Sequence, residues 1–488
     1  MDAPKSSTHR ALGALMQAGL ARQNADGIYY LGFDLLRLVF SYQEAWAPSL
    51  TVGPLLRRLA EETGETTHYG VLVGGNIVYQ AKVSPARQTF QMSSVIGGSN
   101  PAYRTGIGKA LLMHELPDRA SIDRFVAEYG PLEARTPHTI CSAEAIFVTA
   151  SDGTVGVGEV DSAPLVAKAV VEAEPSHLIA RGLRSILLGR NPLDIDVAWH
   201  AMVEGSRYFS GGATMHAISG VDIALWDLAG KILRVPVARL LGGPRSDRLK
   251  AYASLLMPDT PALAAAAAAQ HAEQGYRAMK FGWGPIGQDR AFNEELIKQI
   301  RRAAGDDVEV MIDAGQVWDT KTALRMAAMY EDYGIAWLEE PVAPDNVTGY
   351  RELSRRTSLT IAGGEQESSY AAFETLIDDG ELDLIQPDLA RCGGLTAGRR
   401  VAWLAHTRHR RVVPHAFKSG VLVAASTHFA AAIPNGGLIE HTVSPSPIAR
   451  DLVRRQIAFT DGYVKVPLDQ PGLGVEVDRD VMEQLRVD

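Results

Sequence analysis

Side chains that can bind metals or transfer protons recur through the second half of the chain at intervals of one strand plus one helix. They are Lys280, Asp313, Glu339, Glu365, Asp388, His415 and Glu440, and neighbours in this series are 23 to 33 residues apart. Each lies at or just before the end of a short apolar run that reads as a β-strand. A single acidic residue in such a place is usually a helix N-cap, but capping explains neither Lys280 nor His415. In a parallel barrel all strand ends open on one face, so we expect these groups to converge there.

Three of these residues, Asp313, Glu339 and Glu365, are carboxylates. Because the set contains no cysteine or histidine, the pocket would offer a metal ion only oxygen ligands. Such a pocket suits Mg²⁺ rather than zinc. Without a cation the three negative charges would repel one another by several kcal/mol at an effective dielectric of about 20. The spacing therefore predicts a Mg²⁺ site.

The predicted metal site is flanked by a lysine on one side and an Asp–His pair on the other. Asp388 and His415 come from adjacent strands, where the aspartate would orient the imidazole and raise its basicity. Lys280 must be partly neutral to act as a base, and a nearby metal cation would lower its pKa. Two bases beside a metal suit removal of a proton next to a carboxylate, with the metal stabilising the enediolate.

The elements that must position these groups are eight short apolar runs, each separated from the next by a helical pattern. Eight such units predict a (β/α)₈ barrel, and the missing dinucleotide-binding glycine motif makes a doubly wound open sheet the second choice. Before the barrel, Ser151-Asp152-Gly153 predicts a hairpin between strands at 144–150 and 154–160, followed by helices of an α+β capping domain. The eight runs are Leu249–Ser254, Ala278–Phe281, Glu309–Asp313, Ile335–Glu340, Thr360–Glu365, Leu382–Asp388, Arg411–Ala416 and Leu438–His441.

Length, composition and charge predict several domains in a chain of 488 residues that is 46% hydrophobic and has a net charge of −9. Residues 1–140 carry 13 basic and 12 acidic residues, whereas residues 141–488 carry 35 and 45, which suggests two units of different origin. Cys141 and Cys392 are too few for a disulfide framework. With no membrane-spanning or signal segment expected, we anticipate a cytoplasmic protein without a membrane partner, and a homo-oligomer.

The first 45 residues predict a helix and a hairpin: a helical stripe that stops at Gly19, then a turn at Asn24, Asp26 and Gly27. The segment PKSSTHRALGALMQAGLARQNADGIYYLG resembles the recognition helix and wing of IclR-family transcription regulators. PLLRRLAEETGETTHYGVLVGGNIVYQAKV and YRTGIGKALL resemble the first half of their effector-binding domain. The resemblance implies a partial winged helix at 1–45 and a partial effector domain at 46–140. The IclR-like segment does not include the helices that normally support a recognition helix, which argues against DNA binding.

Residues from about 143 to 488 resemble the mandelate racemase/muconate lactonising branch of the enolase superfamily. The matching motifs are GVGEV, GGATMHAISGVDIALWDLAGK, PVARLLGG, AMKFG, VMIDAGQ, WLEEP, GGEQE, IQPDLARCGG and VPHAF. The resemblance implies a capping domain at 141–247 and a catalytic barrel at 248–488 that returns to the cap. It also implies the following roles: Mg²⁺ ligands Asp313, Glu339 and Glu365; bases Lys280 and His415; Asp388 to orient His415; and Glu440 as an acid that hydrogen-bonds the substrate carboxylate or enediolate.

Three features of the chain depart from that pattern. Ala278 stands where the family usually has the first lysine of Lys-x-Lys, and Gly315 where it often has asparagine. The first strand of the cap is missing or replaced by the IclR-like segment. We expect Arg207, Tyr208 and Phe209 to reach the barrel mouth in its stead.

The leading hypothesis is a Mg²⁺-dependent lyase that dehydrates a sugar acid, an aldonate or aldarate, to a 2-keto-3-deoxy acid. Racemisation or epimerisation, with Lys280 and His415 serving opposite faces, and cycloisomerisation of a hydroxy acid share the same enediolate and stay open. A different class of function, an IclR-type DNA-binding regulator, is the remaining alternative, and the acidic composition argues against it.

Overall fold

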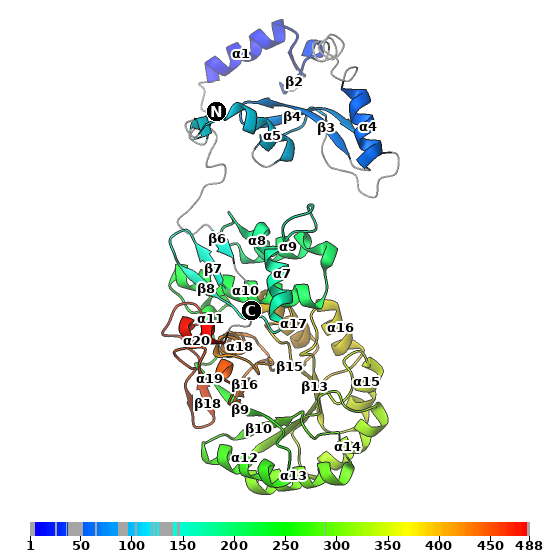
Figure 1. Cartoon of the computed structure of the whole chain (residues 1–488), viewed down its shortest axis with the longest axis vertical. Helices are drawn as coiled ribbons and strands as arrows, with labels where there is room; N and C mark the ends of the chain where they lie inside the picture. The colour runs from blue at the N-terminus through cyan, green and yellow to red at the C-terminus, as the bar shows by residue number, and fades with distance from the viewer. Residues whose placement is uncertain are drawn as a thin grey trace. The chain divides into compact units, whose positions relative to one another are not determined.

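The structure, a computed structural model, falls into two compact units, Met1–Ala134 and Arg135–Asp488. Figure 1 shows both units. No helix in the described part of the chain is long and apolar enough to span a membrane. The structure describes residues 5–24, 27–35, 37, 52–63, 66–85, 96–102, 105–118, 121–122, 124–125, 140–143, 147–287 and 289–485.

The first unit begins with the expected helix and hairpin. Helix α1 (Lys5–Gln17) is followed by strands β1 (Ala21–Gln23) and β2 (Tyr29–Leu31), which pair antiparallel. The helix stops before Gly19, which has a φ of +69° that favours glycine. Asp26, expected in the turn, lies outside the described residues.

The further named elements in the described part of the first unit are a three-stranded antiparallel sheet, one helix before it and one helix after it. Helix α5 begins after Thr105, whose hydroxyl caps the helix by accepting a hydrogen bond from the backbone N–H of Gly108 at 3.0 Å. The buried apolar cluster of this unit consists of Ile77, Tyr79, Ala102 and Leu112. The elements are α4 (Gly53–Thr63), β3 (Thr67–Val73), β4 (Asn76–Val83), β5 (Ser99–Pro101) and α5 (Gly106–Glu115).

The second unit opens with an α+β cap. Strands β6, β7 and β8 form an antiparallel sheet in that order, and β7 and β8 confirm the predicted hairpin, while residues 144–146 of the expected strand lie outside the described part. The long helix α10 packs on this sheet and is buried along most of its length. The elements are β6 (Ile140–Ala143), β7 (Phe147–Ala150), β8 (Val155–Val157), α7 (Pro164–Glu172), α8 (Leu183–Leu187), α9 (Ile195–Gly205), η2 (Arg207–Phe209), α10 (Gly212–Leu233) and α11 (Val237–Leu240).

The barrel follows, and all eight predicted strands are present. Consecutive strands from β9 to β15 pair in parallel, and β16 pairs in parallel with β9. The strands are β9 (Arg248–Leu256), β10 (Ala278–Gly282), β11 (Glu309–Asp313), β12 (Trp337–Glu339), β13 (Thr360–Gly363), β14 (Leu384–Ile385), β15 (Arg411–Val412) and β16 (Leu438–Thr442).

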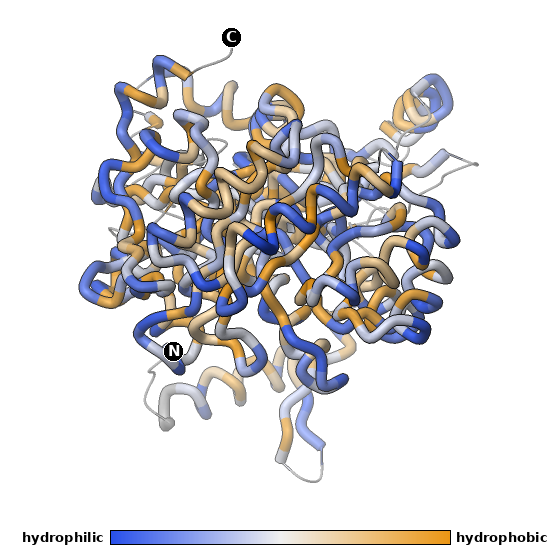
Figure 2. Tube along the Cα trace, turned by 90° about the horizontal axis from the view of Figure 1, so that it is seen from below, coloured by the Kyte–Doolittle hydropathy of each residue, from blue (hydrophilic) through white to orange (hydrophobic). Residues whose placement is uncertain are grey.

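A helix follows each of the first seven barrel strands. Figure 2 shows that hydrophilic and hydrophobic residues alternate along the helical turns of the chain. Asp289, Asp319 and Ser369 cap three of these helices with their side chains. The helices are α12 (Pro261–Glu273), α13 (Arg290–Ala304), α14 (Thr320–Asp332), α15 (Val347–Arg356), α16 (Tyr370–Asp378), α17 (Gly394–Thr407) and α18 (Gly420–Ala432).

Beyond β16 the chain returns to the cap through α19 (Pro447–Arg450), β17 (Phe459–Thr460), β18 (Tyr463–Lys465) and α20 (Arg479–Gln484). Strand β18 pairs antiparallel with β9. The interior of the barrel is filled by one buried layer with a side chain from each strand or its immediate continuation. This layer consists of Tyr252, Ala278, Met311, Trp337, Ala362, Leu384, Val413 and Leu438.

Candidate active site

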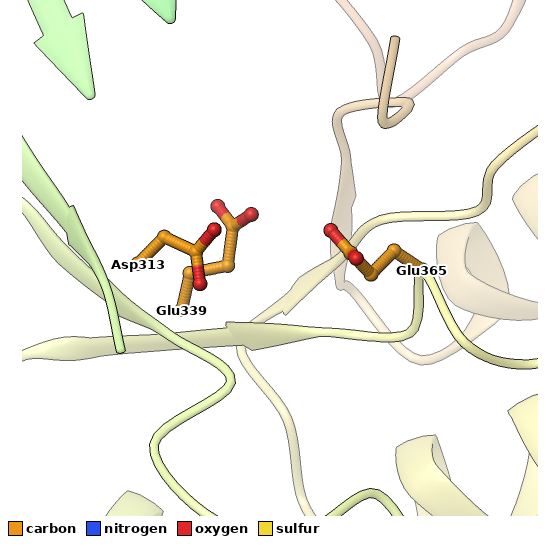
Figure 3. A group of neighbouring side chains, drawn as sticks. All are labelled: Asp313, Glu339 and Glu365. Carbon is orange, nitrogen blue, oxygen red and sulfur yellow. The ribbon is translucent and has the colours of Figure 1, made fainter. Parts of the chain in front are cut away.

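Three carboxylates meet at the carboxyl ends of β11, β12 and β13, as the spacing predicts. Asp313 and Glu339 are the last residues of β11 and β12, and Glu365 follows β13 by two residues. All three are buried, and one oxygen of each lies within 4.8 Å of the others. Figure 3 shows the carboxylates of Asp313 and Glu339 side by side, with Glu365 facing them. The backbone N–H of Gly315 donates to Asp313 Oδ1 at 2.9 Å and fixes that carboxylate.

This carboxylate triad has the electrostatics of a cation site. Burial and the charge of Glu339 raise the pKa of Asp313 to about 8. Burial also raises the pKa of Glu339, although Lys280 opposes that shift. The donors are all carboxylate oxygens, the ligands that hard divalent cations prefer. The residues present therefore fit a divalent metal ion, which would relieve the repulsion.

Lys280, on β10, lies between the triad and the acid of β16. Its Nζ donates to Glu339 Oε1 at 2.5 Å and lies 2.9 Å from Glu440 Oε1. Burial alone would lower the pKa of Lys280, but Glu339 and Glu440 outweigh it and raise that pKa. Glu440 also accepts from Ser254 Oγ at 2.7 Å and from the backbone N–H of Ala416 at 2.5 Å. In this arrangement the lysine is an ammonium ion and Glu440 a carboxylate, whose pKa falls to about 2 because Lys280 and His415 outweigh its burial.

The Asp–His pair forms on the opposite side of the triad. His415 Nδ1 lies 2.6 Å from Asp388 Oδ2, and its Nε2 lies 3.2 Å from Glu365 Oε2. Asp388 is held in turn by the backbone N–H of Ala390 at 2.7 Å. Burial alone would lower the pKa of His415, but Glu365, Glu440 and Asp388 together raise it to about 10. The imidazole is therefore oriented as predicted and is protonated at neutral pH in this arrangement.

A cavity of about 160 Å³ opens onto these groups. Two cationic side chains in its wall were not among the residues that the sequence indicated. Arg391 donates through Nη1 to Glu365 Oε1 at 3.3 Å, and both Arg391 and Lys418 pair with Asp161 of the cap. The lining residues are Ser254, Leu255, Leu256, Lys280, Trp283, Asp313, Glu365, Arg391, His415, Phe417, Lys418 and Glu440.

The segment after β8 joins the cap to the mouth of the barrel. Asp161 accepts from Arg391 Nε at 2.8 Å and lies 2.8 Å from Lys418 Nζ. Two residues earlier, Glu159 accepts from Ser419 Oγ at 2.6 Å and from the backbone N–H of Leu422 at 2.9 Å. Sequence reasoning missed these contacts because the partners are more than 200 residues apart and no local pattern marks them.

We expected three residues of the cap to reach the barrel mouth, namely Arg207, Tyr208 and Phe209. This expectation is wrong for the cavity described above. They form the short helix η2, and none of them lines the cavity. The Tyr208 side chain is 66% exposed, and its ring packs edge-on against His177 of the cap. Ala278 is fully buried in the apolar layer beneath the site, so it offers no polar contact.

A (β/α)₈ barrel with these groups at its carboxyl-terminal mouth defines an enzyme, and comparison with known proteins identifies its family. Residues 262–481 match the family model "Enolase C-terminal domain-like", and residues 131–242 match "Mandelate racemase / muconate lactonizing enzyme, N-terminal domain". The chain belongs to the mandelate racemase/muconate lactonizing enzyme family of the enolase superfamily. Residues 50–150 also match the model "Bacterial transcriptional regulator IclR C-terminal", as the sequence predicts.

Individual relatives are sugar-acid enzymes. D-xylonate dehydratase of Haloferax volcanii is 34% identical over 62% of this chain and 78% of its own. D-galactarolactone cycloisomerase of Agrobacterium fabrum is 29% identical over 70% of this chain and 90% of its own. The crystal structure of 3,6-anhydro-D-galactonate cycloisomerase from Zobellia galactanivorans superposes with a TM-score of 0.65 and 31% identity, covering 70% of this chain and 93% of that one.

Proposed function

We propose that this enzyme removes the proton α to the carboxylate of a sugar acid, with Mg²⁺ held by Asp313, Glu339 and Glu365, and dehydrates it to a 2-keto-3-deoxy acid. The observation that carries the proposal is the triad of buried carboxylates placed between Lys280 and the His415–Asp388 pair. When bound, Mg²⁺ would supply positive charge that stabilises the enediolate.

The protein side chains carry the proton transfers. In its neutral form, Lys280 Nζ accepts the α-proton. Its pKa falls when positive charge at the triad opposes Glu339, which otherwise holds it as an ammonium. His415, as the imidazolium, donates the proton on Nε2 to the β-hydroxyl, which leaves as water, and the enol then tautomerises to the keto acid.

Two acidic side chains set up these transfers without exchanging protons themselves. Asp388 accepts from His415 Nδ1 and stabilises the imidazolium before its Nε2 proton is used. Glu440 is held as a carboxylate by Lys280, Ser254 and the Ala416 backbone, and it lines the cavity, where a substrate hydroxyl could donate to it.

Cycloisomerisation is the second candidate, because two of the similar proteins are named for it. It shares the enediolate with dehydration and differs in the group that leaves or attacks at the β-carbon. Epimerisation would need Lys280 and His415 to exchange protons on opposite faces of the same carbon.

The test is incubation of the full chain with Mg²⁺ and a panel containing D-xylonate, L-rhamnonate and D-galactarolactone. Formation of 2-keto acid is followed by its semicarbazone absorbance, and α-deuterium incorporation in D₂O by NMR. Keto acid from D-xylonate or L-rhamnonate supports dehydration. Keto acid or lactone opening from D-galactarolactone alone supports cycloisomerisation, because the ring oxygen is then the group that leaves. Exchange at the α-carbon alone supports epimerisation. If Mg²⁺ produces none of the three, the proposal fails.

A further inference from the structure

Trp283, the residue directly after β10, has an unusual backbone conformation at the mouth of the cavity. Its φ of +60° is in the left-handed region, which a bulky residue rarely adopts. Such conformations cluster at functional sites, where the surrounding structure holds them in place. Trp283 lines the cavity, and its side chain is 46% exposed.

The surrounding residues hold this conformation. The backbone N–H of Trp283 donates to the backbone carbonyl of Asp313 at 3.2 Å. This hydrogen bond joins the tryptophan backbone to a residue whose side chain is part of the carboxylate triad. Its ring packs over Gly315, where an added Cβ would lie only 3.1 Å from ring atom Cδ2. Glycine in place of the family's frequent asparagine therefore leaves the space that the indole occupies.

The cavity combines apolar and charged surface. Trp283 follows β10 and Leu256 ends the neighbouring strand β9, and both contribute apolar surface; Leu256 is 60% exposed. Arg391 and Lys418, which follow β14 and β15, contribute positive charge. A ligand in this cavity would therefore meet both an exposed indole and cationic groups.

We propose that Trp283 is a specificity-determining residue whose indole packs against the C–H face of the substrate's carbon chain and selects acids of five or six carbons over short hydroxy acids. The inference rests on the proposed function, since it assumes a sugar acid in this cavity. A polyhydroxylated chain offers apolar C–H edges as well as hydroxyls, and a large flat ring that is already exposed and fixed gains buried area at little entropic cost. A purely structural role for Trp283, filling the space above Gly315, would not distinguish long acids from short ones.

The experiment compares Trp283→Ala and Trp283→Phe with the wild-type chain, with Trp403→Ala as the matched control. Trp403 lies on α17, is 57% exposed and does not line the cavity. The measurements, in Mg²⁺, are kcat/KM for D-xylonate and L-rhamnonate, quenching of tryptophan fluorescence by the same acids, and the inhibition constant of glycolate, which has only two carbons.

We expect Trp283→Ala to lower kcat/KM for the five- and six-carbon acids by about tenfold or more and to leave glycolate inhibition within about twofold. Trp283→Phe should recover most of the loss, because it keeps a flat ring, and Trp403→Ala should match the wild type. Equal losses for sugar acids and glycolate, or none in a folded Trp283→Ala, would overturn the inference while leaving the proposed function standing. A wild-type chain that neither turns over nor binds the sugar acids would overturn the proposed function itself.

Discussion

The helix and hairpin at the start of the first unit and the barrel of the second unit bury their apolar side chains to very different extents. Among the residues of α1 and the hairpin, Leu15 is 41% exposed and Leu31 is 75% exposed. In the second unit, each barrel strand or its continuation contributes a buried side chain to the interior of the barrel. The strand ends above this layer carry charged side chains that pair with one another, such as Lys280 with Glu339 and His415 with Asp388.

This difference shows that a sequence motif forms a functional site only where the elements that support it are also present. The helix and hairpin of the first unit form as expected, but a stripe of apolar residues stabilises a fold only when another element covers it. In the barrel, seven polar residues from seven strands converge because every strand of the barrel is present. We therefore expect variants of the barrel to change catalysis far more than variants of the first unit.

The largest effect is expected from removing one charge of the carboxylate triad. Glu339→Gln keeps the volume of the side chain but removes a ligand charge, so Mg²⁺ binding measured by calorimetry and turnover should both fall below detection. The control is Glu309→Gln at the other end of the neighbouring strand, where the carboxylate is 53% exposed and pairs with Lys250. Turnover by Glu339→Gln, or by the wild type in excess chelator, would contradict the metal assignment.

The next effect concerns proton transfer by the Asp–His pair. His415→Asn should lower kcat by roughly 10²-fold or more, the scale of general acid–base catalysis. Asp388→Asn should lower kcat less, because the imidazole remains but loses the carboxylate that orients it at 2.6 Å. Wild-type turnover in both variants would show that this pair is not part of the chemistry.

The third effect is on stability and is specific to the second unit. His428 accepts from the backbone N–H of Ala238 and lies 3.2 Å from the Leu473 carbonyl, and burial lowers its pKa from 6.5 to about 4. The unfolded chain therefore binds this proton before the folded chain does, so its contribution to stability is present above pH 6.5 and lost as the pH falls towards about 4. The difference in free energy of unfolding between wild type and His428→Gln should shrink by about 3 kcal/mol over that range. A difference that does not change with pH would contradict this assignment.

The smallest effect is expected from the first unit. Fluorescence anisotropy with labelled duplex DNA should detect only weak binding without sequence preference, which weakens steeply as salt is raised. Arg10→Ala, at an exposed position of α1, should reduce that binding further. Tight, sequence-selective binding near physiological salt would instead favour the regulator alternative.

The sequence predicted the positions of the barrel strands better than their ends. Glu309–Asp313 is observed as predicted, whereas the predicted run Leu382–Asp388 is a strand only at Leu384–Ile385. The final residues of such runs leave the ladder at the barrel mouth, where their side chains turn towards the site. Asp388 and His415 still pair there as an isolated parallel bridge.

The convergence of the seven residues could be predicted because one strand-plus-helix repeat places each of them at the same level of the barrel. Asp161 and Trp283 could not be. The first depends on an ion pair with Arg391 from a segment 230 residues away. The second depends on a left-handed backbone conformation and on the space above Gly315, which appear only when two loops pack together.

The proposed reaction begins when the barrel removes an α-proton from a sugar acid with the help of a divalent cation. The most direct measurement is NMR of D-xylonate incubated with the full chain in D₂O, with Mg²⁺ and with excess chelator. We predict Mg²⁺-dependent loss of the α-proton signal, accompanied by a 2-keto-3-deoxy acid, and no change in chelator or with Glu339→Gln. An α-proton signal that survives in Mg²⁺ for every acid of the panel, or that disappears equally in chelator, would contradict the account.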